Sequence, residues 1–141
     1  MEKLYWKDEY SVGVEKFDRQ HRHLFEILNK LIVRSAESLD LKLASETLTE
    51  MLNYAKEHFR DEEELMREYG YPEIELHKEQ HAYFIETTAE LSVNALNKQS
   101  MVSHEIAEFL KLWWTTHILK VDMKYKDFFK AKIPAKAASS G

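Results

Sequence analysis

The stretch LASETLTEMLNYAKEHFRDEEELMREYG, residues 43–70, carries apolar residues at steps of three and four along its length. This spacing puts them on one face of an α-helix and predicts a helix from about Leu43 to Tyr69. Gly70 can adopt the left-handed conformation that ends many helices, and Pro72 suits the first turn of a following helix. The inward stripe comprises Leu48, Met51, Leu52, Ala55, Phe59, Leu65, Met66 and Tyr69.

Other segments show the same spacing and predict three further long helices. They cover about residues 18–39, 72–97 and, after a serine cap, 103–121, and a last helical stretch follows at 123–129. Asp18 is expected as the N-cap of the first of them. Four antiparallel helices with short connections predict an all-α, up-down-up-down four-helix bundle.

The two ends of the chain differ from the middle. Residues 1–17 do not repeat at helical spacing and are expected to lie on the bundle as an extended N-terminal arm. Residues 131–141 are mostly Ala, Lys and Ser and are expected to form a flexible tail. Residues 1–130 are therefore expected to form one domain.

The composition limits the classes of function. The 141 residues include 20 Lys and Arg against 25 Asp and Glu, and the net charge of −5 disfavours a nucleic-acid partner. Because no apolar run approaches the roughly 20 residues that span a bilayer, no membrane partner is expected. The chain has no cysteine, which excludes thiolate metal sites and fits a cytoplasmic location.

Polar residues interrupt the apolar stripes. His58 and Glu62 are four residues apart on one predicted helix, and His77 and His81 are four residues apart on the next. The two members of each pair therefore share a helix face. A carboxylate on such a face needs a cation or a raised pKa, because burying it unpaired is costly. The interrupting residues are His21, His58, Glu62, His77, His81 and His117.

These six residues are expected at one height in the bundle. His21 lies 19 residues before the predicted turn near Asp40, and His58 lies 18 residues after it. The same count from the turn near Gly70 places Glu62 and His77 at similar heights, and the count from the turn near Ser100 does so for His81 and His117. The heights agree to within about 5 Å, one turn of an α-helix. Five imidazoles and a carboxylate therefore converge on one layer of the interior.

Asp122 is a candidate with two interpretations. It follows His117 by five residues, which on an ideal helix turns it about 140° away. Taken alone, this spacing favours an N-cap of the last helical stretch over a metal ligand. Five other polar residues point away from the layer and are expected at the surface: His23, Asp61, Glu63, Glu64 and His104.

The candidate side chains indicate a two-metal site. Imidazole with carboxylate suits iron, zinc, copper or nickel. Seven ligands exceed the six places around one ion and fit two ions that share bridging carboxylates. No histidine has a glutamate three residues before it, so the Glu-x-x-His motif of ferritin-like di-iron enzymes is not matched.

Five motifs resemble those of the hemerythrins, in particular the single-domain bacterial form called bacteriohemerythrins. The resemblance covers about residues 4–129. The motifs are DRQH at 18–21, HFRDEEELM at 58–66, YP at 71–72, HKEQHAYF at 77–84 and WWTTHILKVD at 113–122. A carboxylate five residues after the last histidine belongs to that pattern, so the resemblance makes Asp122 a ligand.

The resemblance implies two iron ions with a bridging oxo or hydroxo group, and dioxygen as their ligand. One iron is then held by His77, His81 and His117, the other by His21 and His58, with Glu62 and Asp122 as bridges. Dioxygen binds at the second iron, which keeps an open place. Five apolar residues are expected around that place: Leu24, Phe59, Trp113, Trp114 and Ile118.

Reversible dioxygen binding, for storage, transport or delivery to an oxygen-consuming enzyme, is therefore the predicted function of a monomer that is not an enzyme. No acid or base is found among the expected pocket residues, and this favours binding over catalysis. A di-iron oxidase or peroxidase and an oxygen or redox sensor are the alternatives. Trp114 departs from the family, which often has leucine there, and a larger ring could narrow the pocket.

Overall fold

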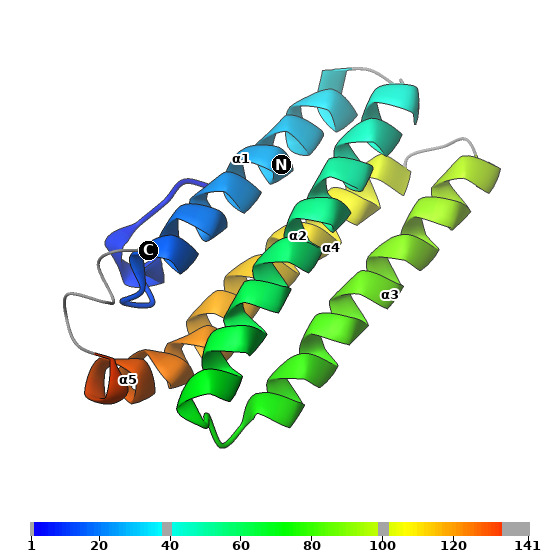
Figure 1. Ribbon diagram of the computed structural model, residues 1–141. Coiled ribbons are helices and arrows are strands. Elements are labelled where there is room, and N and C mark those ends of the chain that lie inside the picture. Colours follow the sequence, from blue (N-terminus) through cyan, green and yellow to red (C-terminus); the bar gives the residue numbers. More distant parts are fainter. Residues whose placement is uncertain (1, 38–40, 99–101, 134–141) are drawn as a thin grey trace.

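The computed structural model describes residues 2–37, 41–98 and 102–133. Within these residues four long helices run antiparallel, each beside its neighbours in the chain, and the first also contacts the fourth (Figure 1). The predicted four-helix bundle is confirmed. Its elements are η1 (Asp8–Tyr10), α1 (Glu15–Glu37), α2 (Leu41–Tyr69), α3 (Ile74–Lys98), α4 (Val102–His117), η2 (Ile118–Asp122) and α5 (Met123–Lys132).

The first helix begins earlier than its sequence predicts, at Glu15, so Asp18 is not its N-cap. The Asp18 carboxylate instead accepts hydrogen bonds from Ser11 Oγ at 2.6 Å and from the Val12 backbone N–H at 2.8 Å. An aspartate that can cap a helix can equally accept donors from a neighbouring segment. This one ties the N-terminal arm to α1.

The arm lies on the bundle as predicted, but it is not wholly extended, because η1 forms within it. Trp6 and Tyr10 lie against Phe25 of α1, with ring centroids 5.8 and 5.3 Å away. The backbone of Leu4 exchanges two hydrogen bonds with the Asn29 side chain, at 2.8 and 2.9 Å. Aromatic packing and paired hydrogen bonds thus hold the arm on α1.

The turn between α2 and α3 forms where Gly70 predicts it. Gly70 has a φ of 70°, and the N–H of Tyr71 reaches back to the Met66 carbonyl at 2.8 Å. Pro72 precedes α3, which begins at Ile74 rather than with the proline. The other two predicted turns lie outside the described residues. The flexible tail predicted at 131–141 is wrong for its first three residues, because Ala131 and Lys132 belong to α5 and Ile133 is buried in the core. Residues 134–141 lie outside the described residues.

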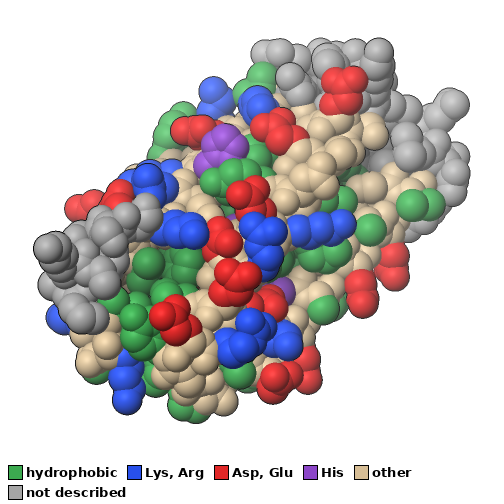
Figure 2. All heavy atoms as spheres, in the orientation of Figure 1, with side chains coloured by type: hydrophobic (Ala, Val, Ile, Leu, Met, Phe, Trp, Pro, Cys, Tyr) green, Lys and Arg blue, Asp and Glu red, His purple; other side chains and the backbone are tan. Residues whose placement is uncertain are grey.

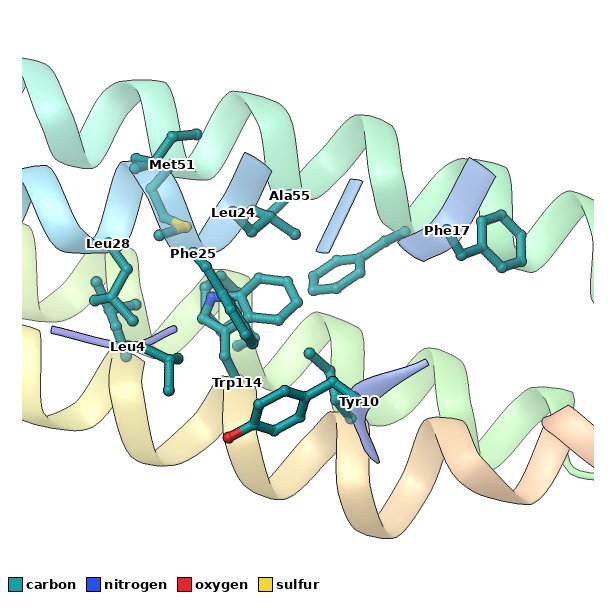
Figure 3. Packing of buried hydrophobic residues seen from close by; sticks show 14 of the residues in the cluster. Leu4, Tyr10, Phe17, Leu24, Phe25, Leu28, Met51, Ala55 and Trp114 are labelled. Carbon is teal, nitrogen blue, oxygen red and sulfur yellow. The ribbon is translucent and has the colours of Figure 1, made fainter. Parts of the chain in front are cut away.

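Apolar side chains fill the half of the bundle on the Trp114 side of the polar layer. Figure 3 shows Trp114 pointing inward from α4, with Leu24 and Leu28 of α1 and Met51 and Ala55 of α2 around it. All five are at most 1% exposed. Burying a large apolar side chain contributes roughly 1.5–3 kcal/mol, so this half fixes the helices around the polar layer. Across the described residues, no helix is long and apolar enough to cross a membrane.

Candidate metal centre

The polar residues predicted from the sequence meet in one buried layer. His58 and Glu62 of α2 and His21 of α1 are completely buried. The histidines of α3 and α4, which are His77, His81 and His117, are each 2% exposed. Their rings contact one another across helices, with centroids 4.5 Å apart for His21 and His58 and 4.9 Å apart for His77 and His117.

Asp122 joins this layer because the helix widens just before it. Residues Ile118–Asp122 form a π-helical turn, in which hydrogen bonds close from residue i to i+5. Side chains five residues apart therefore come to the same side, and Asp122 lies beside His117. Asp122 stands at the N-cap position of α5 but makes no capping hydrogen bond, so the interpretation as a cap is wrong.

The Asp122 carboxylate lies between histidines of three helices. Its Oδ1 is 2.9 Å from Nε2 of His77 and 3.1 Å from Nε2 of His117. Its Oδ2 is 3.3 Å from Nε2 of His21. One carboxylate thus faces the α3 and α4 histidines with one oxygen and α1 with the other.

Glu62 has a similar position on the other side of the layer. Its Oε1 is 3.2 Å from Nε2 of His58 and 3.4 Å from Nε2 of His81. Its Oε2 accepts a hydrogen bond of 2.5 Å from the buried Tyr125 hydroxyl. The layer therefore contains two groups that could each hold a metal ion, and both include Glu62. One is Glu62 with His77, His81 and His117, and the other is Glu62 with His21 and His58.

The inward-facing atoms of this layer have no hydrogen-bond partner among the residues that the structure describes. The histidine Nε2 atoms lie close to the carboxylate oxygens, but these contacts do not have the alignment of hydrogen bonds. Leaving one such buried group unpaired costs about 1–3 kcal/mol, and more for a charged one. Two bound cations would satisfy all of them together. The atoms are Nε2 of His21, His58, His77, His81 and His117, Oε1 of Glu62, and both oxygens of Asp122.

Outer hydrogen bonds aim two of the rings. Nδ1 of His58 donates to Gln20 Oε1 at 2.5 Å, and Nδ1 of His117 donates to Gln80 Oε1 at 3.2 Å. A donor hydrogen on Nδ1 leaves the lone pair on Nε2, which is the atom that faces the layer. Metal-binding histidines in proteins are usually oriented in this way.

Glu63 plays the same part for His81, and the prediction that Glu63 is solvated surface charge is wrong. Nδ1 of His81 lies 2.8 Å from Oε2 of Glu63, whose side chain is only 21% exposed. Asp61 was also predicted at the surface, but its side chain is 12% exposed and it accepts a hydrogen bond from Gln20 at 2.8 Å. Both side chains bend back toward the helices beside them.

The remaining predictions of surface residues have mixed outcomes. Glu64 is exposed and the His23 side chain is 43% exposed, as expected. The side chain of His104 lies outside the described residues. Sequence reasoning missed Gln20, Gln80 and Tyr125, because helix spacing gives a direction but not the length a side chain can reach.

The electrostatics of the layer favour ionised carboxylates. Burial raises the pKa of Glu62 and Asp122, but the surrounding histidines hold it well below the usual value. Burial also lowers the pKa of His58 and His117. For His81 the Glu62 and Glu63 carboxylates overcome burial and raise the pKa to about 9.

Aromatic rings border the layer on its apolar side. Trp114 is fully buried and lies 6.4 Å from His21 and 6.2 Å from His58, between ring centroids. Phe59 lies 5.6 Å from Trp114. Trp113 stacks on His117 at 4.3 Å instead, so its ring faces the three-histidine group. Leu24 and Ile118, the other two expected pocket residues, are completely buried.

A family model described as "Hemerythrin HHE cation binding domain" matches residues 12–129. The chain belongs to the hemerythrin family. It is 35% identical over 130 residues to a bacteriohemerythrin of Stenotrophomonas maltophilia, covering 92% of this chain and 84% of the relative. It is 32% identical over 121 residues to a myohemerythrin of Theromyzon tessulatum, covering 86% and 89%.

Solved hemerythrin structures show the same fold. A wild-type hemerythrin crystal structure superposes with a TM-score of 0.81 at 27% identity, covering 88% of this chain and 95% of that one. Membership of the family confirms the resemblance found in the motifs. Hemerythrins bind a di-iron centre, and this chain is a di-iron oxygen-binding protein.

Proposed function

We propose that this hemerythrin binds dioxygen reversibly, as a store or carrier, at two iron ions held by seven side chains. The observation that carries the proposal is the set of unpaired atoms that converge in the buried layer. Their geometry and chemistry fit a pair of cations with carboxylate bridges. The proposed ligands are His21, His58, Glu62, His77, His81, His117 and Asp122.

The two ions have unequal sets of ligands in this proposal. Three histidines of α3 and α4 hold one ion, whereas His21 and His58 alone hold the other. Glu62 and Asp122 bind both ions. The short distances from each carboxylate to histidines of both sets support this assignment. The ion with two histidines keeps a free place, and we assign dioxygen to that place.

When bound, the iron pair supplies a coordination place for dioxygen and the two electrons that bind it reversibly. The protein supplies a dry pocket, because Leu24, Trp114 and Ile118 are completely buried. The indole N–H of Trp114 is the one polar group among them, and it only donates hydrogen bonds. Because none of these three side chains is an acid or a base, the pocket is suited to hold dioxygen rather than to convert it.

We propose further that the protein is not an enzyme and that it delivers dioxygen to an oxygen-consuming partner. The apolar side chains beside His21 and His58 support the first point. A monomer in the cytoplasm is the setting we propose, and the absence of cysteine fits that reducing compartment.

The test is to reduce the iron-loaded protein without air and then to alternate air and argon while recording the visible spectrum. The expected result is a colour that appears under air and fades under argon over repeated cycles. Consumption of reductant for each dioxygen over many turnovers would instead indicate an oxidase or peroxidase. A spectrum that never responds to air would contradict dioxygen binding itself.

A further inference from the structure

A groove runs along the surface between α2 and α3. Its volume is about 420 Å³, and Figure 2 shows Lys and Arg side chains gathered on this face over the line between the two helices, with acidic side chains among them. The groove is lined by Lys56, Phe59, Arg60, Glu63, Glu64, Arg67, Lys78, His81, Ala82 and Ile85.

The charge of the groove is opposite to that of the whole chain. Its four cationic and two acidic side chains leave an excess of positive charge, whereas the chain carries −5. Lys56, Arg67 and Lys78 form no ion pair with the part of the chain that the structure describes. Arg60 has Asp61 at 3.7 Å, but its own side chain is 63% exposed. An acidic molecule would therefore be drawn to this face.

The inner wall of the groove belongs to the metal layer. Phe59 stacks on His81 with ring centroids 3.8 Å apart and planes 6° from parallel. Nδ1 of His81 contacts Glu63 at 2.8 Å, and Glu63 is partly exposed in the groove. A molecule seated there lies close to His81, whose Nε2 faces the layer. Phe59 also packs on Trp114, which borders His21 and His58, with ring centroids 5.6 Å apart.

We infer that this groove is the docking surface for the acidic face of a one-electron carrier protein, which returns oxidised protein to its ferrous state. This inference rests on the proposed function, because ferric protein formed by slow oxidation cannot bind dioxygen. Two carrier molecules each lose one electron, and two ferric ions each gain one. Any proton needed to balance the added charge would come from solvent.

The first test is the salt dependence of reduction. Iron-loaded, oxidised protein is mixed without air with reduced plant-type [2Fe–2S] ferredoxin, an acidic one-electron carrier, and the second-order rate constant is measured as ionic strength rises. The groove predicts a rate constant that falls with salt, because local attraction is screened. Two proteins of net negative charge that met at random would repel, so a rate constant that rises with salt would overturn the inference.

The second test is a pair of charge-reversal variants. Lys56→Glu with Lys78→Glu changes the groove, and Lys3→Glu with Lys124→Glu makes the same change in net charge on exposed side chains elsewhere. The groove variant is expected to react about tenfold more slowly than the control. The binding of oxidised ferredoxin, measured by calorimetry, should also be weaker for the groove variant than for the control. Equal rates and equal binding in the two variants would overturn the inference.

Iron content and the response to air are measured on each preparation before mixing. If both are normal and the groove variant behaves like its control, the docking surface is wrong and dioxygen binding stands. If the wild-type protein retains no iron pair, the proposed function fails together with the inference that rests on it.

Discussion

The hydroxyl of Tyr125 in α5 donates a hydrogen bond of 2.5 Å to Oε2 of Glu62 in α2, and both side chains are completely buried. Burial and the neighbouring carboxylates raise the pKa of Tyr125 well above its usual value, so the proton stays on the phenol. This bond occupies one oxygen of Glu62 and leaves Oε1 directed at His58 and His81. The last helix thus holds a residue of the metal layer in position.

Replacing Tyr125 by Phe should destabilise the metal-free protein by about 1.5–3 kcal/mol, the contribution of a hydrogen bond to a charged group. Denaturant unfolding of the metal-free protein measures this difference. Tyr83→Phe is the matched control, because Tyr83 is 57% exposed and its loss should cost under about 0.5 kcal/mol. Equal stabilities for the two variants would show that the bond to Glu62 does not hold the layer.

The metal-free protein should lose stability as pH rises from about 6.5 to 9. The folded pKa of His81 is raised to about 9 from the ordinary 6.5, so its contribution is complete below 6.5 and disappears as pH passes 9. The upper limit is about 3 kcal/mol. The raised pKa of His21 acts with the same sign. The lowered pKa values of His58 and His117 change stability only below pH 6.5.

Unfolding free energies measured across this pH range check the prediction, with two comparisons. Glu63→Gln should flatten the slope, because it removes one of the carboxylates that raise the pKa of His81. Iron-loaded protein should show no such slope, because an imidazole bound to iron cannot take up the proton. A stability that rises over this range in metal-free protein would contradict the assignment.

Replacing Trp114 by Leu should speed the oxidation of the ferrous protein. The smaller side chain opens the space beside His21 and His58 to water, and the cavity should cost about 2 kcal/mol of stability. Trp113→Leu is the matched control on the adjacent residue, because Trp113 stacks on His117 of the other group. The decay of the oxygenated spectrum measures both. Faster oxidation in the Trp113 variant would instead indicate that dioxygen binds beside the three-histidine group, and it would contradict the assigned pocket.

The sequence predicted the bundle and most of the metal layer because regular helices convert residue counts into height and direction. His58 and Glu62, four residues apart on α2, are the clearest case. The same rule misplaced Asp122, since the π-helical turn before it changes the rotation per residue, and no pattern in Ile118–Asp122 marks that turn. Only the family pattern indicated this aspartate.

The outer contacts of the layer could not be predicted for a different reason. Glu63 points away from the layer by helix rotation, yet its side chain bends back to His81. Gln20 precedes His21 but reaches His58 on another helix. These contacts depend on the distance between helices and on side-chain length. Both quantities follow from the packing of the whole bundle rather than from spacing within one helix.

The most direct test of the central claim is the iron content per chain after anaerobic loading with ferrous salt and removal of unbound metal. We predict about two irons in the wild-type protein and in His23→Ala, whose histidine is exposed. Glu62→Ala should retain fewer than about one, because both groups share that carboxylate. Wild-type protein without a retained iron pair, or Glu62→Ala with a full pair, would contradict the account.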